Sequence, residues 1–251
     1  IGEWVLVSAC RQARDWLGLT LMRLLRDRGW KPIELPRDEW PWLLGAIAFG
    51  GVLGPLSLMV GLSHSTAATA SLFLNLESVL TAVLAWVVFR ESTDRRIVLG
   101  MLMIVAGGAV LAWPGGEASA FGIGPLALAG ACLAWAIDNN LTRKVSASDA
   151  LFIAGSKGLV AGGVNTGLGL ALGAAWPTGG VLSAALLVGF LGYGLSLVLF
   201  VLALRGLGTA RTGAYFSTAP FVGAAISIAV FGEPTSPAFW FDAALMAVGV
   251  W

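Results

Sequence analysis

A succession of apolar segments, each about as long as a membrane-spanning helix, limits this chain to very few architectures. A spanning helix needs about 20 predominantly apolar residues. Two weaker segments, at 13–27 and 237–251, accompany seven clear ones. The short polar connections between them leave no room for a separate soluble domain. We therefore predict an all-α polytopic helix bundle whose secure spans are 40–63, 65–89, 97–113, 121–142, 149–175, 181–204 and 209–231.

The scarcity of charge shows which environment such a bundle needs. Only 12% of the residues are charged and 57% are hydrophobic, whereas a soluble domain carries about 25% charged residues. The chain cannot cover a water-facing surface, so we predict an integral membrane protein and exclude soluble enzymes and nucleic-acid binders. Its two cysteines, Cys10 and Cys132, and its single histidine, His64, predict neither a disulfide framework nor a His-rich metal site. The glycines match no nucleotide-binding fingerprint, so no cofactor is expected.

The distribution of Lys and Arg predicts how the chain crosses the membrane. Short cytoplasmic loops retain basic residues, whereas external loops lack them. From residue 23 onward, basic and non-basic connections alternate without exception. This alternation supports the spans and their orientation; the basic connections are 23–37, 90–96, 143–144 and 205–211, and the others are 62–66, 114–120, 176–180 and 232–237.

An internal repeat appears at an offset of 142 residues. The sequence VVFRES at 87–92 aligns with AVFGEP at 229–234, and the frame holds without gaps from 58–109 to 200–251. The connection after the first copy is basic and its counterpart is not, and the reverse holds for the connections before the copies. The copies therefore cross the membrane in opposite directions, and five helices per repeat fit the spacing. Inverted repeats of this kind are typical of secondary transporters.

Several motifs occur in an order that is similar to one known family. They are FRE at 89–91, FGE at 231–233, the pair Trp135-Ala136, and the stretches LNLESVLTAVLAWVVFRE, WAIDNNLTRK and KGLVAGGVN. On these residues the chain resembles the EamA-like permeases of the drug/metabolite transporter superfamily, over roughly residues 13–251. The resemblance implies ten helices in two inverted five-helix repeats, and a permease or exporter of a small metabolite in the bacterial inner membrane.

The two repeats define the expected domain organisation. We expect a first repeat over 1–113 and a second over 121–251. Residues 1–12 do not resemble the first helix of the family, so that helix is expected to be missing or altered. The last helix is expected to be truncated.

Glu77 is the clearest candidate for a functional residue. It lies 12 residues from each end of the segment 65–89, which at about 1.5 Å per residue places it near the middle of the bilayer. Ionisable residues in spanning helices are costly and mark solute or ion pathways. Asn75 and Ser78 place further polar groups on the same helix. Three roles remain open for Glu77: a solute contact, a proton-coupling group, or a purely structural carboxyl.

Asp138 and Lys157 are predicted to form an ion pair. They lie on consecutive helices joined by a cytoplasmic turn, some 8 and 12 Å from that turn at about 1.5 Å per residue. A Lys side chain can reach across that difference, and Glu77 is its alternative partner. The pair would either fix the hairpin of the two helices or form part of the solute path. Asn139 and Asn140 add amide groups, at least one of which should face the bundle or a hydrated cavity.

Three further polar residues are weaker candidates for the solute path. Asn165 shares a helical face with Gly158 and Gly162, so packing against another helix is its favoured role. Tyr215 lies on a polar stripe that runs inward from the cytoplasmic end, where it is well placed for solute contact. Tyr193 is a weaker candidate for a cavity position.

Prolines predict local disturbance in two of the spans. Pro55 lies in the segment 40–63, and Pro220 lies in the segment 209–231 at the repeat position of Ser78. A proline in a spanning helix leaves a carbonyl without its helical partner, which is tolerated beside a cavity. We therefore expect disturbed backbone at both sites.

Two classes of function fit these residues. The first is a secondary transporter in which a small-molecule solute binds near the middle of the membrane and the repeats rock around it, with protons as a candidate coupling ion. The alternative is an intramembrane enzyme that uses Glu77 and Asp138. An enzyme needs clustered catalytic groups or metal ligands, whereas the acids of this chain are scattered. We therefore favour the transporter and expect no catalytic residues, metal or nucleic-acid partner. A membrane scaffold ranks third, because an acid near the midplane argues against it.

Overall fold

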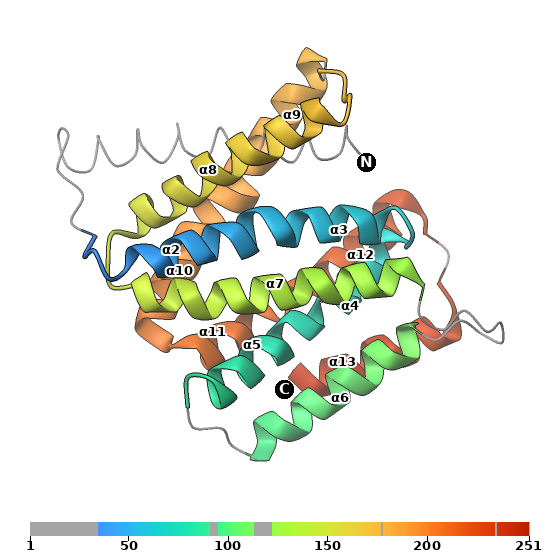
Figure 1. Cartoon of the computed structure of the whole chain (residues 1–251). Coiled ribbons are helices and arrows are strands. Elements are labelled where there is room, and N and C mark those ends of the chain that lie inside the picture. Colours follow the sequence, from blue (N-terminus) through green and yellow to red (C-terminus); the bar gives the residue numbers. More distant parts are fainter. Residues whose placement is uncertain (1–34, 91–94, 113–121, 177, 234, 251) are drawn as a thin grey trace. The chain divides into compact units, whose positions relative to one another are not determined.

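Every element in the described part of the chain is a helix (Figure 1). The computed structural model describes residues 35–90, 95–112, 122–176, 178–233 and 235–250. All seven secure spans form helices, which confirms an all-helical bundle, and the weaker segment 237–251 is helical over Pro237–Val250. The other weaker segment, 13–27, and the first-helix prediction for residues 1–12 lie outside the described residues.

The chain divides into two compact units. The first combines Ile1–Leu56 with Ile137–Gly208, and the second combines Ser57–Ala136 with Thr209–Trp251. Each unit therefore combines residues of both sequence repeats, whose bounds stay a prediction. The helices α3 (Gly54–Leu62) and α7 (Ile123–Val145) contain the boundary and contribute residues to both units.

The first unit is organised around α8 (Ala150–Ala171), which packs against η1 and α10. Leu43, Ile153 and Val201 are wholly buried in its core, and Trp40 meets Phe152 edge-on with ring centroids 6.3 Å apart. Besides α8 and its parts of α3 and α7, the unit contains α2 (Trp40–Ala46), the π-helical segment η1 (Ile47–Leu53), α9 (Gly179–Gly189), the π-helical segment η2 (Phe190–Leu195) and α10 (Ser196–Leu207).

Arg205, at the end of α10, ties several helix ends of the first unit together. Its guanidinium donates to the carbonyl of Ser146 at 2.6 Å and to the carbonyl of Ser148. The hydroxyl of Ser148 in turn donates to Glu39 at 2.9 Å, immediately before α2. Because Arg143 ends α7 in the same neighbourhood, the ends that carry basic residues gather on one side of this unit, as the predicted topology requires.

The second unit consists of helices that pair across the repeat. It contains α4 (Ala67–Phe73), α5 (Asn75–Val87), α6 (Arg95–Ala112), α11 (Thr209–Phe216), α12 (Ala219–Phe231) and α13 (Pro237–Val250). Helix α4 packs on α12, α11 packs on α5, and α6 packs on α13. At the 142-residue offset α4 corresponds to α11, α5 to α12 and α6 to α13. Each contact is therefore matched by its repeat equivalent.

Close backbone contact makes the pairing of α6 and α13 possible. A side chain at Gly100 would overlap the carbonyl oxygen of Gly249, and a side chain at Gly249 would lie 2.7 Å from the carbonyl oxygen of Gly100. No residue with a Cβ fits these two positions without moving a backbone. Small residues at such crossings are the usual way in which spanning helices approach closely.

Two of the predicted spans, 65–89 and 209–231, are interrupted helices. The first breaks at Leu74, where Glu77 donates its backbone N–H to the Leu74 carbonyl three residues earlier at 3.0 Å. The second breaks at residues 217–218, just before Pro220 in the first turn of α12. Proline is tolerated in a first turn because its missing N–H would have no helical partner there. The predicted disturbance at Pro220 is thus a helix start.

Glu233, after α12, caps the beginning of α4. Its carboxylate accepts hydrogen bonds from the backbone N–H groups of Ala67 at 3.0 Å and Ala68 at 2.7 Å. The Thr66 hydroxyl accepts a further bond from the Thr69 N–H at 3.2 Å. Negative charge at a helix N-terminus is favourable because the first N–H groups are unsatisfied. The end of one repeat helix is thereby fixed to the start of another.

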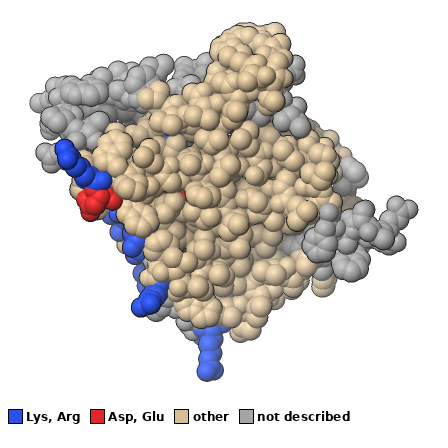
Figure 2. Space-filling model, viewed as in Figure 1, with Lys and Arg blue, Asp and Glu red and all other residues tan. Residues whose placement is uncertain are grey.

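The described helices have the length and the surface of membrane spans. Three stretches are long and apolar enough to cross a bilayer, at Trp40–Leu62, Ala67–Val87 and Phe190–Leu207. Large apolar side chains such as Leu99 and Val222 are exposed, and Figure 2 shows a broad face on which Lys and Arg lie only at the edge. Soluble monomers rarely expose such a surface. The molecule is an integral membrane protein.

Candidate functional site

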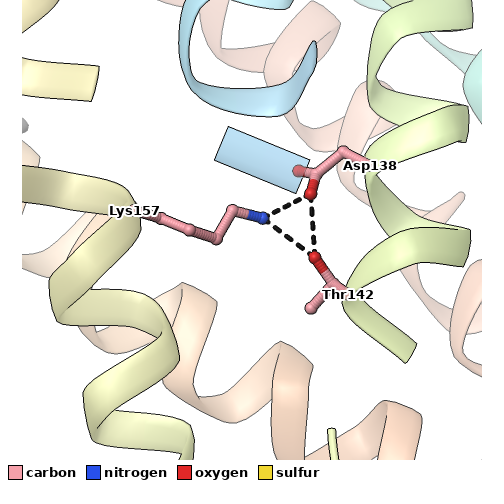
Figure 3. A network of polar contacts seen from close by, with 3 residues as sticks. All are labelled: Asp138, Thr142 and Lys157. Atoms are coloured by element: carbon pink, nitrogen blue, oxygen red, sulfur yellow. Dashed lines mark hydrogen bonds and ion pairs between the residues drawn. The ribbon is translucent and has the colours of Figure 1, made fainter. Parts of the chain in front are cut away.

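Asp138, Thr142 and Lys157 form a buried polar triad in the first unit (Figure 3). The Lys157 ammonium lies 2.5 Å from Asp138 Oδ1 and donates to Thr142 Oγ1 at 3.0 Å. The Thr142 hydroxyl donates to the same Asp138 oxygen at 2.8 Å. The predicted ion pair between Asp138 and Lys157 is therefore confirmed.

The local sequence explains how α7 and α8 hold the triad. Asp138 and Thr142 are four residues apart on α7, so they lie one above the other on the same face. Asp149 starts α8 as its N-cap and accepts the Leu151 N–H at 2.9 Å. Lys157 lies two turns further into α8, and its long side chain extends to the Asp138 carboxylate, as Figure 3 shows.

A glycine of η1 leaves room for the Asp138 carboxylate. A Cβ built on Gly50 would overlap the Asp138 carboxyl group. The carboxylate is thus enclosed between the bare backbone of η1 and the Lys157 ammonium. An ammonium has three donors, and two of them are used within the triad. Among the described residues, one Lys157 donor is left to bind a further polar group.

Asn165 bonds across to η1, one turn before Pro55. Its side-chain amide donates to the carbonyl of Gly51 at 2.8 Å. The Gly51 carbonyl lies in the π-helical turn that precedes Pro55, whose ring nitrogen has no N–H to donate. The Asn165 amide thus bonds to the disturbed backbone next to the proline. The predicted packing role of Asn165 and the predicted disturbance at Pro55 are both confirmed.

Asn139 and Asn140, next to Asp138 on α7, are both buried. The prediction that at least one of them faces the protein is therefore confirmed. Adjacent residues on a helix point about 100° apart. Two consecutive buried amides thus mean that α7 is enclosed on more than one side at this level.

In the second unit, Asn75 and Glu77 lie at the break between α4 and α5, and both are buried. The Asn75 amide donates to the Leu72 carbonyl at 3.1 Å and to the Met246 sulfur at 3.7 Å. The thiol of Cys132 on α7 donates to the Phe73 carbonyl at 3.7 Å. Polar side chains and a neighbouring helix thus surround the exposed backbone of the break.

Ser78 joins the two helix breaks of the second unit. It is half-buried on α5, and its hydroxyl accepts a hydrogen bond from the Ser217 hydroxyl at 2.5 Å. Ser217 lies between α11 and α12, at the repeat position of Asn75. The broken stretches of the two repeats are thereby connected by a polar contact.

The two tyrosines are placed differently from the buried residues. Tyr215, near the end of α11, is 72% exposed. Tyr193 lies within η2, and its side chain is outside the described residues. Their predicted contacts with a solute stay predictions.

Three polar residues of the structure were not among the predicted site residues. Thr142 could have been found from its spacing of four residues from Asp138. Ser217 could have been found by carrying the polar position 75 across the repeat. Asp242 is a fully buried acid on α13, and a lone acid in an apolar segment was its only signal.

Comparison with known proteins places the chain in a family. A model of the EamA-like transporter family matches residues 17–113. The chain is 27% identical over 245 residues to an uncharacterized transporter of Methanothermobacter thermautotrophicus, a match that covers 92% of this chain and 69% of the relative. It is 36% identical over 107 residues to the probable 4-amino-4-deoxy-L-arabinose-phosphoundecaprenol flippase subunit ArnE of Pseudomonas aeruginosa, which covers 43% of this chain and 89% of that protein.

A crystal structure shares the fold. It matches 99% of this chain and 85% of its own chain, with a TM-score of 0.76 and 21% sequence identity. The all-helical architecture, the buried polar residues in spanning helices and the matched relatives agree with one another. The chain belongs to the EamA-like transporter family of the drug/metabolite transporter superfamily.

Proposed function

We propose that the protein is a secondary transporter that moves a small polar solute across the bacterial inner membrane by alternating access. The observation that carries this proposal is the Asp138–Thr142–Lys157 triad inside two spanning helices. Burying two opposite charges costs several kcal/mol per ion before their attraction offsets it. A helix hairpin could be joined more cheaply by apolar contacts, so the charges point to a task beyond holding the fold.

The arrangement of the second unit supports an inverted repeat. Its helix pairs α4–α12 and α11–α5 are exchanged by the repeat, and α6–α13 maps onto itself. Such reciprocal contacts are what a two-fold axis produces. The breaks at Leu74 and at residues 217–218, and the segments η1 and η2, also fall at equivalent repeat positions. Broken spanning helices in matching positions of two repeats are typical of solute sites in secondary transporters.

Within this proposal, each buried polar group has a role. Lys157 and Asp138 offer a donor and an acceptor to a solute with both kinds of group, and Asn139, Asn140 and Asn165 line or support the path. In the other unit Asn75, Ser78 and Glu77 act at the helix break. Tyr193 and Tyr215 are further path residues.

Glu77 is the proposed coupling residue. A carboxyl in the first turn of a broken helix lies near unsatisfied N–H groups, and its burial makes ionisation sensitive to whether water reaches it. Proton binding to Glu77 could therefore follow the opening of the path to either side. Its other proposed role is to orient a solute amine.

The relatives suggest two substrate classes. A small metabolite is the first, because the family is one of transporters. The second is an amino-sugar headgroup carried on a lipid, which is suggested by the ArnE relative. An amine on either solute would suit the acid Glu77. The intramembrane enzyme remains the alternative, with Glu77 and Asp138 as its catalytic acids.

Uptake by reconstituted vesicles tests the proposal. A panel of labelled amino acids, amino sugars, nucleobases and dicarboxylates should contain members that the wild type takes up faster than empty vesicles. The variant Asp138→Asn/Lys157→Met removes both charges together and should keep the fold but lose this uptake. Equal uptake by this variant and the wild type would exclude the triad from the path.

A matched measurement tests the coupling role of Glu77. Uptake of the same solutes is compared for the wild type and Glu77→Gln, each with and without an imposed pH gradient. The wild type should respond to the gradient and Glu77→Gln should not, because a glutamine cannot exchange a proton. If Glu77→Gln transports normally and responds equally to the gradient, Glu77 is structural.

A further inference from the structure

Asp242 on α13 is a buried acid that the proposed solute path does not use. Its side chain is 0% exposed. Neither carboxyl oxygen has a hydrogen-bond partner among the residues that the structure describes. A buried group of this kind is rare, because unpaired polar groups in an interior are costly.

The contact between α6 and α13 encloses this carboxyl. A Cβ built on Gly107 of α6 would lie 2.7 Å from Asp242 Oδ1 and 2.7 Å from Met246 Cγ. Asp242 and Met246 therefore face the same bare stretch of α6 backbone. Two turns further along, Gly100 and Gly249 bring the two helices into backbone contact. In this arrangement Asp242 is closed to water, and a separation or tilt of α6 and α13 would expose it.

The helices packed around α13 bring no compensating charge to Asp242. The described part of α6 carries Arg95 and Arg96, which are exposed and lie about 16–18 Å along the helix from Gly107. Helix α4 contains no titratable residue, and α12, which shares an apolar cluster with α13, contains none either. One turn along α13 from Asp242, the Met246 sulfur accepts a hydrogen bond from the uncharged Asn75 amide at 3.7 Å.

These surroundings decide which form of the carboxyl is present. An ionised carboxylate in an apolar interior without a partner costs many kcal/mol and is avoided by taking up a proton. A neutral carboxyl with an unsatisfied hydroxyl costs only about 1–3 kcal/mol. Burial without a partner thus favours the neutral carboxyl of Asp242 over the carboxylate while α6 and α13 are in contact.

We propose that Asp242 is a proton-binding site, which holds a proton while α6 and α13 are in contact and releases it to the external side when they separate. The side follows from its depth. Asp242 lies five residues after Pro237, or about 8 Å from the start of α13. That end of the helix follows the connection 232–237, which has no basic residue and is therefore external.

The proposal has a defined dependence on pH. An Asp in water releases its proton above about pH 4, so from that pH up to the higher pH at which the buried carboxyl itself ionises, the closed contact holds one proton more than an open or unfolded chain. Its stability should fall as the pH rises, by about tenfold in the equilibrium per pH unit. External acid therefore favours the closed contact. Only the use of this proton to drive a solute rests on the proposed transport function.

Infrared spectroscopy of the wild type tests the site without any variant. Protein labelled with carboxyl-¹³C aspartate should show, at neutral pH, an isotope-shifted C=O band of a protonated carboxyl. The other Asp residues in the described part of the chain are expected to be ionised and to give no such band. Asp138 is paired with Lys157, and Asp38 and Asp149 reach the surface. Absence of a shifted protonated band at neutral pH would overturn the proposal.

The variants Asp242→Asn and Glu77→Gln separate this site from the proposed coupling residue. Asp242→Asn keeps the shape and neutrality of the protonated side chain, so it should lose the band and keep the fold. Its melting temperature should no longer fall between mildly acidic and mildly alkaline pH. Glu77→Gln should keep the aspartate band and the pH dependence that comes from Asp242. The proposal fails if Asp242→Asn shows the wild-type pH dependence.

Vesicle transport then distinguishes the two proposals. If the proton site is present and solute uptake by Asp242→Asn equals that of the wild type, Asp242 binds a proton that does not couple to transport. If uptake is absent in all variants and in the wild type, the proposed function fails while the infrared result for Asp242 still stands.

Discussion

Replacing Lys157 with methionine should destabilise the protein by about 3–5 kcal/mol, the largest effect expected of any single substitution here. The change leaves the Asp138 carboxylate buried without its counter-charge, while Thr142 supplies one hydroxyl bond. Methionine has nearly the length of lysine, so little cavity is created. Thermal and denaturant unfolding of the purified protein measure the loss.

The double variant Asp138→Asn/Lys157→Met is the control for this prediction. It removes both charges, so it should recover most of the stability lost by Lys157→Met alone. Comparing the double variant with the single variants Asp138→Asn and Lys157→Met gives the coupling energy of the pair. Additive losses, with no recovery in the double variant, would contradict a direct interaction between the buried charges.

Replacing Gly50 with alanine should cost about 2–3 kcal/mol, because its Cβ would overlap the Asp138 carboxyl group. The carboxylate must move, and its bonds to Lys157 and Thr142 are then lost or bent. The loss should therefore be smaller in the Asp138→Asn/Lys157→Met background, where the overlap with the side chain at 138 remains but no ion pair is broken. Unfolding of four proteins measures how the loss depends on the ion pair: the wild type and the Asp138→Asn/Lys157→Met variant, each with and without Gly50→Ala.

Gly192→Ala is the matched control, because Gly192 occupies the repeat position of Gly50 within η2. No heavy atom among the described residues lies within 4 Å of a Cβ built there. The substitution should be neutral or slightly stabilising, since alanine is a better helix former than glycine. Equal losses for Gly50→Ala and Gly192→Ala would mean that the glycine at position 50 acts through the π-helical backbone and not through Asp138.

The spans and the ion pair were accessible from the sequence for simple physical reasons. A spanning helix has a length fixed by the bilayer, so apolar segments such as 40–63 and 149–175 read directly as helices. A buried charge must be neutralised, and the depths of Asp138 and Lys157 below one turn left few partners. Asn165 could be placed against another helix because glycines share its face.

The features that the sequence did not predict depend on contacts between distant segments. Leu74 is a good helix former, so its own residue type does not predict the end of α4. The break is stabilised by the neighbouring Asn75 amide and by Cys132 from another helix. Whether Asp242 faces lipid, water or the interior depends on the register of α13 against α6. The functions of Glu77, Asn75, Ser78 and the two tyrosines stay predictions, because burial alone does not distinguish a solute contact from a structural group.

Alternating access can be measured at Ser78 without knowing the solute. In a Cys10→Ser/Cys132→Ser background, Ser78→Cys is treated with a membrane-impermeant thiol reagent from either side of oriented vesicles. His64→Cys, in the exposed turn after α3, and Lys144→Cys, at the exposed end of α7, are controls that should each react from one side only. We predict that Ser78→Cys reacts from both sides, because the path opens to each in turn; reaction from one side only, or from neither, would contradict the transporter mechanism.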